Sequence, residues 1–369
     1  MSGLRVALSV DALSSQLTGI GRYCLELVRG LPGDDRVSQV SYFRGITWLA
    51  DPAILLHGGE PKIPRKKWRR SWDRWWNYGR FADALVHAPN YFLPPWAERG
   101  IATVHDLSVF KYPQTHPPER VRAFEAHFAD TVKRAGLILT DCEWVRREVI
   151  DFTGLPETRV RAVPLGVSPA YHPREGNELV SVIAGMGLTA GGYGLCVSTF
   201  EPRKRINTLL LAWRNLPLET RSRTPLVLAG ASGWGNDALM AQIDQGQREG
   251  WLIHIGFVPE ERLPLLYAGA KLFAYPSQYE GFGLPPLEAM ASGVPTIVAG
   301  GTCLEEVGGG VAISINPEDI PEFSNTIRLL LEDQNLHERL SIDGIRHSAG
   351  FDWPGCVRHT IDAYQVLVG

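Results

Sequence analysis

Two glutamates in the segment YPSQYEGFGLPPLEAMASGVP, residues 275–295, have a spacing that suits ligand binding. Glu280 precedes two prolines that open a predicted helix, and Glu288 follows within roughly its first turn, so both carboxylates face one crevice. Gly281 and Gly283 permit a close approach of the backbone, whose free amides point at a ligand. Acidic side chains near a helix start also simply stabilise the helix. Their combination with the glycines favours a site for paired hydroxyls of an elongated ligand.

Two adjacent cations lie in the segment STFEPRKRINTLL, residues 198–210, which follows an apolar run. Arg203 and Lys204 stand in the predicted turn before a helix, beside its free amides. Arginine offers a two-pronged fork and lysine a point charge, and together they suit a diphosphate. The alternative is a solvated basic helix start, and the segment by itself leaves both interpretations open.

A histidine and an aspartate end an apolar run in the segment TVHDLS, residues 103–108. Active residues of open α/β sheets lie at the carboxyl ends of strands, and this position favours a role for His105 in a site. A His105–Asp106 pair also fits a structural, hydrogen-bonded strand end.

Two glycines lie in the segment TGIGRY, residues 18–23, at the first predicted turn from strand to helix. Gly19 and Gly21 let the backbone approach a ligand, and the helix start offers free amides. A dinucleotide-binding fingerprint needs a third glycine where this chain has Cys24, which argues against NAD binding. A tight turn without a ligand is the alternative.

These residues need a scaffold of alternating strands and helices, and the apolar pattern predicts one. Short apolar runs are separated by polar loops or by amphipathic stretches such as 119–134. The alternation predicts parallel sheets covered by helices. We expect strands at 4–10, 84–88, 101–104, 137–140, 160–164, 194–199, 226–230, 252–255, 272–275, 295–299 and 311–315.

The length of 369 residues predicts two domains. Proline, glycine and polar residues gather at 165–192, which is the composition of an interdomain connection. We therefore expect two doubly wound α/β domains, 1–170 and 193–350, joined by a linker region at 171–192. Domains of this kind that face each other bind ligands in the cleft at the carboxyl ends of their strands.

Composition excludes several classes of protein. The net charge is −3, from 37 basic and 40 acidic residues, which argues against a nucleic-acid partner held by its backbone. No apolar stretch approaches the ~20 residues needed to span a bilayer. The odd number of widely spaced cysteines, five, and the short apolar start indicate reduced thiols in a cytoplasmic protein.

Several segments together resemble the retaining GT-B glycosyltransferases of family 4. Glu280 and Glu288, with seven residues between them in EGFGLPPLE, are similar to the paired-glutamate signature of that family. The segments TGIGRY, VHDLS, PLGVSP, EPRK and GFVPEERLPLLYAGA follow in the family's order over nearly the whole chain. The ending at 351–369 resembles a C-terminal helix that crosses back towards the N-terminal domain. The resemblance implies the GT-B fold, with acceptor bound by the N-terminal domain and nucleotide sugar by the C-terminal one.

The resemblance also implies roles for individual residues. Arg203 and Lys204 would bind the donor diphosphate, Glu280 the sugar hydroxyls and Glu288 the ribose hydroxyls. One departure is that many relatives have an arginine where this chain has Ser198 and Thr199, so Arg203 would supply that charge. Residues that would contribute further to the donor site are Gly19, Gly21, His105, Gly281, Phe282, Gly283 and Leu284.

Transfer of a hexose with retention is the activity that the resemblance implies, with His105, Glu280, Arg203 and Lys204 as catalytic residues. The segments TGIGRY, EPRKRINTLL and GGTCLEEV are most similar to bacterial mannosyltransferases that use GDP-mannose. The acceptor would be a polyprenyl-diphosphate-linked saccharide of cell-surface polysaccharide. No cofactor and no metal ion are expected, because fixed cations and helix-start amides replace the metal. Alternatives are another UDP- or GDP-sugar donor, a sugar-nucleotide epimerase or a phosphorylase of the same fold, and a non-catalytic membrane-binding module.

A basic, tryptophan-rich segment at 66–80, KKWRRSWDRWWNYGR, suggests binding to a membrane surface. Residues 62–80 carry a charge of +7, from eight basic residues and one aspartate. The tryptophans recur at i, i+4, i+7 and i+8, so a helix would align them on one face, with indoles at the depth of anionic headgroups. The alternatives are packing on the protein's own domain and nucleic-acid binding. The predicted docking residues are Trp68, Arg69, Arg70, Trp72, Trp75 and Trp76.

Replacement of Arg69, Arg70 and Arg74 by glutamate is predicted to release the protein from anionic liposomes, because like charges then repel. Turnover of a short soluble acceptor should be unaffected. Liposome co-sedimentation measures the binding, and unchanged co-sedimentation of the variant would contradict a peripheral association with the inner membrane through this segment.

Overall fold

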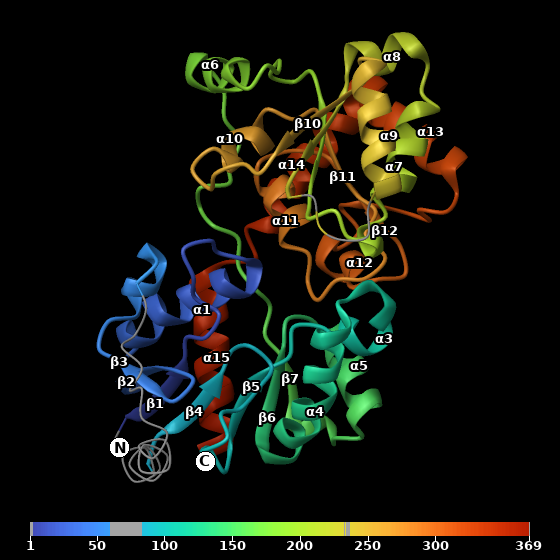
Figure 1. Cartoon of the computed structure of the whole chain (residues 1–369). Coiled ribbons are helices and arrows are strands. Elements are labelled where there is room, and N and C mark those ends of the chain that lie inside the picture. The colour runs from blue at the N-terminus through green and yellow to red at the C-terminus, as the bar shows by residue number, and fades with distance from the viewer. Residues whose placement is uncertain (1–2, 60–82, 232, 234–236, 369) are drawn as a thin grey trace. The chain divides into compact units, whose positions relative to one another are not determined.

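The computed structural model describes residues 3–59, 83–231, 233 and 237–368. The chain forms two compact units, which Figure 1 shows in colours that follow the sequence. Unit 1 comprises Met1–Gly166 and Trp353–Gly369, and unit 2 comprises Val167–Asp352. Each contains one sheet with helices packed on it, and both sheets belong to the doubly wound α/β class that the alternating pattern predicts.

Unit 1 is built on a seven-stranded sheet in the order β3-β2-β1-β4-β5-β6-β7. All neighbouring strands pair in parallel except β2 and β3, which are antiparallel. The loops that follow the carboxyl ends of the parallel strands can therefore carry functional residues. The strands are β1 Leu4–Ser9, β2 Val37–Arg44, β3 Thr47–Leu49, β4 Leu85–Ala88, β5 Gly100–Thr103, β6 Ala135–Thr140 and β7 Val160–Ala162.

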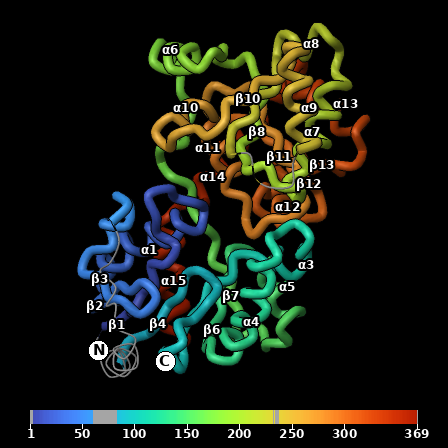
Figure 2. Tube along the Cα trace, in the orientation of Figure 1, coloured from blue at the N-terminus to red at the C-terminus, as the bar shows by residue number. Residues whose placement is uncertain are grey.

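Unit 1 contains helices from residues 19–153 and one from the end of the chain, residues 353–368. In Figure 2 the red helix α15 lies beside the blue helix α1, and the two helices are in contact. An isopropyl group of Val357 packs so closely on Gly30 that a Cβ there would lie 2.7 Å from it. The α-helices are α1 Gly19–Gly30, α3 Ser108–Lys111, α4 Pro118–Arg134, α5 Glu143–Thr153 and α15 Trp353–Val368, with short 3₁₀ turns at Leu31–Gly33, Pro52–His57, Pro113–Thr115 and Glu157–Arg159.

Unit 2 is built on a six-stranded, wholly parallel sheet in the order β10-β9-β8-β11-β12-β13. Every residue of the central strands β9, β11 and β12 is buried, as expected for a sheet covered on both faces. The strands are β8 Gly194–Val197, β9 Leu226–Ala229, β10 Leu252–Gly256, β11 Leu272–Tyr275, β12 Thr296–Ala299 and β13 Ile313–Ile315.

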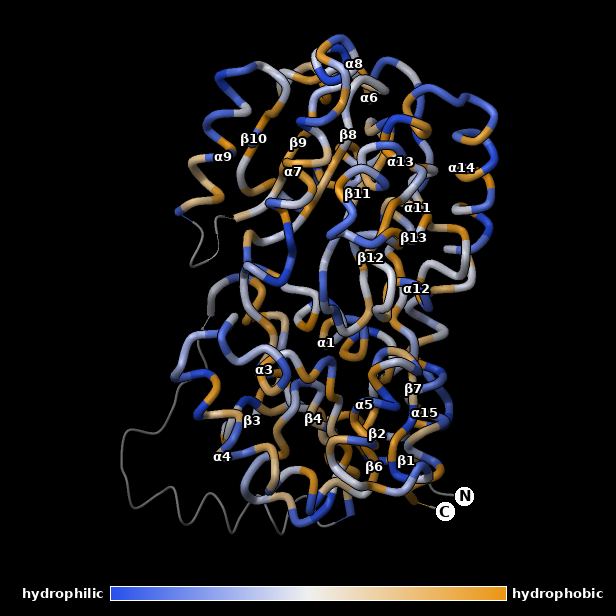
Figure 3. Tube along the Cα trace, turned by 90° about the vertical axis from the view of Figure 1, so that its right-hand side faces the viewer, coloured by the Kyte–Doolittle hydropathy of each residue, from blue (hydrophilic) through white to orange (hydrophobic). Residues whose placement is uncertain are grey.

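Helices of unit 2 follow almost every strand. Figure 3 colours the inner strands β8 and β9 mostly as hydrophobic and the outer helix α14 largely as hydrophilic, as layered packing requires. The helices are α6 Asn177–Gly185, the 3₁₀ turn η5 Pro202–Lys204, α7 Ile206–Arg214, α8 Leu218–Arg223, α9 Asp237–Arg248, α10 Leu263–Ala268, α11 Leu284–Ala291, α12 Cys303–Gly308, α13 Ile320–Glu332 and α14 Gln334–Ser348.

Two parts of the fold differ from the sequence pattern. Strands β2 and β3 were not expected, because the polar and partly exposed residues of β2, VSQVSYFR, interrupt an apolar run, and β3 has only three residues. Residues 171–192, expected to be a linker, carry helix α6 and lie in unit 2. Leu179 and Ile183 of α6 are buried, and the Gly191 N–H donates to the Gly269 carbonyl at 2.7 Å, which binds this segment to unit 2.

The predicted docking residues Trp68, Arg69, Arg70, Trp72, Trp75 and Trp76 lie outside the described residues. Among the residues that are described, no helix combines the length and the apolar character needed to cross a membrane. All five cysteines are free and buried, as expected from their spacing.

Replacement of Gly194 by alanine is predicted to destabilise unit 2. A Cβ at Gly194 would lie 2.0 Å from the indole of the fully buried Trp213, so strand β8 or helix α7 must shift. Overpacking of this kind costs about 1–3 kcal/mol. Calorimetry should show a fall of several degrees in the Tm of unit 2. Gly185→Ala, in open space at the end of α6, is the matched control and should leave Tm nearly unchanged.

Candidate functional site

A buried cluster of two cations and one carboxylate joins two predicted site segments in unit 2. Arg203 and Lys204 lie in turn η5, and Glu280 lies in the loop after β11. The Lys204 ammonium donates to Oε1 of Glu280. Nη1 of Arg203 donates to Oε2 of Glu280 at 3.3 Å and to the Tyr279 carbonyl at 2.8 Å. One carboxylate therefore holds both cations that the sequence predicts for a diphosphate.

Two further side chains hold these cations. Oε2 of Glu201 accepts from Nε of Arg203 at 3.0 Å, and the Tyr275 hydroxyl accepts from the Lys204 ammonium at 2.9 Å. The ammonium also lies 5.3 Å from the centre of the Tyr275 ring, within the range of a cation–π interaction. Only 8% of the Lys204 side chain and 12% of the Arg203 side chain are exposed.

The electrostatics of the cluster follow from its burial. Burial alone raises the pKa of Glu280, but the positive charges of Lys204 and Arg203 outweigh this effect and lower the pKa to about 2. Burial lowers the pKa of Lys204, and the charge of Glu280 opposes that shift. Glu280 is therefore ionised at neutral pH and balances part of a positive charge that is already fixed in place.

The parallel sheet brings the two segments together. Strands β8 and β11 are neighbours, so η5 after β8 and the loop after β11 meet at their carboxyl ends. The Gln278 N–H donates to the Arg203 carbonyl at 2.8 Å and fixes the loop on the turn. Gly230 at the end of β9 has φ +136°, and a Cβ there would lie 1.9 Å from the Ser198 carbonyl oxygen. That close approach requires glycine.

The glycine-rich loop after Glu280 leads into helix α11. Gly283 caps the helix with φ +113°, and a Cβ there would lie 2.5 Å from Leu304, so this position also needs glycine. Helix α11 begins at Leu284, and its first turn contains two prolines, as predicted. The Phe282 ring is buried and packs edge-on against Phe351 at 5.9 Å.

Glu288 lies farther along α11 than the sequence interpretation placed it. It is the fifth residue of the helix, one full turn beyond Leu284. Burial and the negative charge of Glu288 raise the pKa of Tyr267, which places the two side chains close together.

His105 forms a second buried ionic group, in unit 1. It follows β5, and its Nδ1 lies 2.8 Å from Oδ2 of Asp141, the residue that follows β6. Its Nε2 lies 2.8 Å from the Pro89 carbonyl oxygen. The neighbouring Asp106 instead accepts hydrogen bonds from the backbone and hydroxyl of Ser108, where helix α3 begins. His105 and Asp106 of the segment TVHDLS therefore bind separate partners and do not form a pair with each other.

Gly19 and Gly21 lie at the start of helix α1, as the segment TGIGRY predicts. The Thr18 hydroxyl accepts from the Gly21 N–H at 3.2 Å and caps the helix. A Cβ at Gly21 would lie 3.0 Å from the Ala12 carbonyl oxygen, so this glycine permits close packing of the turn. Tyr23, two residues on, lies edge-on to the His105 ring at 5.4 Å, which links the turn to His105 within unit 1.

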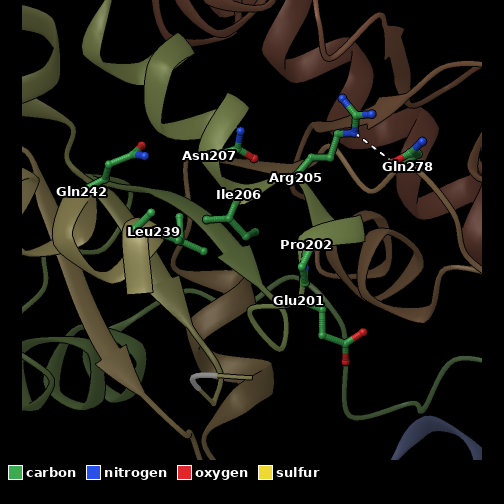
Figure 4. Close-up of a pocket in the computed structure, with 9 residues that line it drawn as sticks. Glu201, Pro202, Arg205, Ile206, Asn207, Leu239, Gln242 and Gln278 are labelled. Carbon is green, nitrogen blue, oxygen red and sulfur yellow. Dashed lines mark hydrogen bonds between the residues drawn. The ribbon is translucent and has the colours of Figure 1, made fainter. Parts of the chain in front are cut away.

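A pocket of about 420 Å³ lies beside the ion cluster in unit 2 and is shown in Figure 4. Arg205 adopts the left-handed backbone conformation, φ +51°, and its Nε donates to Gln278 at 3.2 Å. Arg203 and Lys204 do not line this pocket, because their side chains are turned to Glu280. The lining residues are Glu201, Pro202, Arg205, Ile206, Asn207, Ala238, Leu239, Gln242 and Gln278.

Sequence interpretation missed three residues that hold the predicted ones. Glu201 and Tyr275 support the cations of unit 2, and Asp141 supports His105. A signal existed for Asp141, because the segment LILTD ends a predicted strand with an acid at the sheet edge that carries His105. Among the described residues, no three His, Cys, Asp or Glu side chains lie close enough together to hold a metal ion.

Comparison with protein families gives a match in each unit. A family model described as "Glycosyl transferases group 1" matches residues 192–347. A second, described as "Glycosyltransferase Family 4", matches residues 17–171. The first match contains the ion cluster and Glu288, and the second contains His105 and the glycine turn.

Individual relatives extend over the whole chain. The O-antigen chain mannosyltransferase B of Escherichia coli is 36% identical to it, covering 99% of this chain and 100% of that protein. Among solved structures, sucrose-phosphate synthase from Thermosynechococcus elongatus has a TM-score of 0.74 at 21% identity and covers 99% of each chain. Anabaena HepE in complex with UDP-glucose has a TM-score of 0.75 at 16% identity, covering 98% of this chain and 99% of that one.

Glu280→Gln is predicted to destabilise unit 2 by roughly 3 kcal/mol at pH 7, because it leaves the buried Lys204 without its carboxylate and Arg203 with Glu201 alone. The lowering of the Glu280 pKa from 4.5 to about 2 means that the ionised carboxylate stabilises the fold above about pH 4.5. This contribution is lost as the pH falls towards 2, so the difference from the unmodified protein should shrink there.

Urea denaturation at pH 7, 5 and 3 measures this difference in the free energy of unfolding. Glu175→Gln, at an exposed position of unit 2, is the matched control and should show little change at any pH. An equal loss for Glu280→Gln at all three pH values would contradict an ionised Glu280 in the cluster.

Proposed function

This chain belongs to the group 1, family 4 glycosyltransferases and has their GT-B fold, and from that premise we propose that it is a retaining mannosyltransferase. It transfers mannose from GDP-mannose to a lipid-linked saccharide during synthesis of a cell-surface polysaccharide. The name and full-length similarity of the Escherichia coli O-antigen mannosyltransferase support the choice of sugar and pathway.

The observation that carries the proposal is the cluster of Arg203, Lys204 and Glu280. Negative charge grows on the diphosphate as its bond to the sugar breaks, and two cations held in a dry site stabilise that charge without reorganisation. Glu280 forms ion pairs with both cations. On donor binding the diphosphate takes over as their anionic partner, and Glu280 accepts hydrogen bonds from sugar hydroxyls.

The remaining predicted residues complete the donor site. Gly281, Phe282, Gly283 and Leu284 offer backbone amides at the start of α11, where the helix dipole favours an anion. Glu288, one turn further on, binds the ribose hydroxyls. In unit 1, Gly19 and Gly21 at the start of α1 contact the phosphates, and His105 contacts the transferred sugar.

Retention follows from transfer on one face of the sugar. The acceptor hydroxyl oxygen forms a bond to the anomeric carbon on the face from which the diphosphate leaves. The bond between the anomeric carbon and the phosphate oxygen breaks, and that oxygen takes the proton of the acceptor hydroxyl. Arg203 and Lys204 stabilise the departing diphosphate, and this route needs neither a cofactor nor a metal ion.

The acceptor is a polyprenyl-diphosphate-linked saccharide at the cytoplasmic face of the inner membrane. The basic tryptophan-rich segment at 66–80 supports this location by its sequence alone. Its cations would meet anionic headgroups while the sugar end of the acceptor reaches the enzyme.

A donor panel tests the function. The purified protein is incubated with GDP-mannose, GDP-fucose, UDP-glucose or UDP-galactose, with and without a mannose-terminated lipid-linked acceptor, and nucleoside diphosphate release is followed. Release of GDP from GDP-mannose that requires the acceptor is the expected result. Release from a different donor, and not from GDP-mannose, would show that the transferred sugar is not mannose. Conversion of a donor in the absence of acceptor would indicate an epimerase.

Lys204→Ala is predicted to lower the rate of mannose transfer by at least about a hundredfold, because a fixed cation that stabilises the leaving group is lost. The matched control is Arg339→Ala, which removes an exposed cation of α14 in the same unit and should keep the unmodified rate. Both rates come from GDP release at saturating acceptor. Full turnover by Lys204→Ala would exclude the cluster as the donor site.

A further inference from the structure

His105 carries a hydrogen-bond pattern that defines its charge. Its two ring nitrogens each lie 2.8 Å from an oxygen, one of the Pro89 carbonyl and one of the Asp141 carboxylate. His105 is 6% exposed and Asp141 is 3% exposed, so water does not take the place of either partner. A carbonyl can only accept a hydrogen bond, which requires a proton on Nε2.

The second nitrogen faces an acceptor as well. Burial raises the pKa of Asp141, and the charge and hydrogen bond of His105 oppose that shift. With Asp141 ionised, the carboxylate accepts only, so its hydrogen bond to Nδ1 requires a proton there too. A histidine with protons on both nitrogens is an imidazolium, and Asp141 supplies the opposite charge beside it. Burial disfavours the charged form of His105, but the charge and hydrogen bond of Asp141 outweigh burial and raise the pKa of His105.

We propose that Asp141 is a positioning residue for the transfer reaction, holding His105 as an imidazolium with a fixed ring orientation at the carboxyl end of β5. The proposal rests on the proposed function, in which His105 contacts the transferred sugar. Asp141 does not touch the substrate and acts through His105. Both of its N–H groups are donated to Asp141 and Pro89, so His105 offers the substrate a fixed positive charge and does not serve as a general base.

The other titratable groups around His105 agree with this assignment. Tyr23 of α1 and Tyr91 of the loop after β4 lie edge-on to its ring at 5.4 and 5.9 Å, and burial raises the pKa of both, so neither adds charge. Asp106 follows His105 in the chain, accepts hydrogen bonds from Ser108, and its negative charge also raises the pKa of His105. His87 of β4 is a further titratable neighbour.

His87 provides an internal contrast. Its ring nitrogens bond to hydroxyls, of Tyr364 at 2.7 Å and Thr103 at 2.8 Å, and a hydroxyl can donate as well as accept. Burial and the positive charge of His105 lower the pKa of His87 to about 3. Of two buried histidines in neighbouring segments, one is therefore neutral, and the one with a carboxylate is charged. Asp141 makes the difference.

The proposal predicts how activity depends on pH. If the protonated form of His105 supports transfer, kcat/KM for the donor falls as the pH rises through the His105 pKa. Asp141→Asn removes the negative charge and should lower that pKa by about one to three units. The basic limb of the profile then moves to lower pH by the same amount. Above the lowered pKa, activity falls about tenfold for each pH unit.

The experiment compares the pH profile of mannose transfer in the full-length protein with those of Asp141→Asn and Asp141→Glu. At pH values below the lowered His105 pKa, Asp141→Asn should approach the rate of the unmodified protein. Asp141→Glu restores a carboxylate and should move the basic limb of the profile back. Asp151→Asn, at an exposed position of α5, is the matched control. An unmoved limb, or a loss of equal size at every pH, would overturn the proposal.

A second readout does not depend on activity. Nitrogen-15 NMR of the histidine-labelled protein, with His105 assigned by loss of its signals in His105→Gln, should show protons on both ring nitrogens at pH 7. A neutral His105 in the unmodified protein would overturn the proposal even if Asp141→Asn fails to fold. If the unmodified protein transfers no mannose, the proposed function fails, while the NMR result still decides the charge of His105.

Discussion

The ion cluster of Lys204, Glu280 and Arg203 is the interaction around which unit 2 is organised. Two cations side by side in a buried turn are unfavourable unless an anion lies between them, and Glu280 is that anion. This requirement fixes the turn after β8 against the loop after β11, and with it the start of helix α11. In the donor complex that we propose, a diphosphate replaces the carboxylate as the partner of these fixed positive charges.

Unit 1 uses the same physical device, a buried basic side chain held by a carboxylate. Asp141 holds His105 there, and both residues follow neighbouring parallel strands. In each unit the sheet brings loop residues together that lie far apart in the sequence. Loss of one partner would leave a buried charged group unpaired, which costs free energy. Each ionic group therefore fixes the geometry of its loops as well as their charge.

The sequence predicts the scaffold well because buried parallel strands are continuous apolar runs, and the strands that carry the site, β5, β8 and β11, all lie where such runs occur. It also gives Arg203, Lys204 and Glu280 as candidates by their residue types, and Glu280 by its neighbouring glycines, and the structure brings the three side chains together. It does not predict that Glu280 holds both cations, since the pairing depends on strand order. The partners Glu201, Tyr275 and Asp141 are not predicted for the same reason. Strand β2 is not predicted because it is partly polar and lacks a hydrophobic run.

A crystal structure of the protein with GDP-mannose tests the central claim most directly. We predict diphosphate oxygens within hydrogen-bond distance of the Arg203 guanidinium and the Lys204 ammonium, with Glu280 turned to the mannose hydroxyls and Glu288 to the ribose. The contacts between the two cations and Glu280 would be exchanged for contacts to the donor. A nucleotide sugar bound elsewhere, with Glu280 still paired to both cations, would contradict the assignment of this cluster as the donor site.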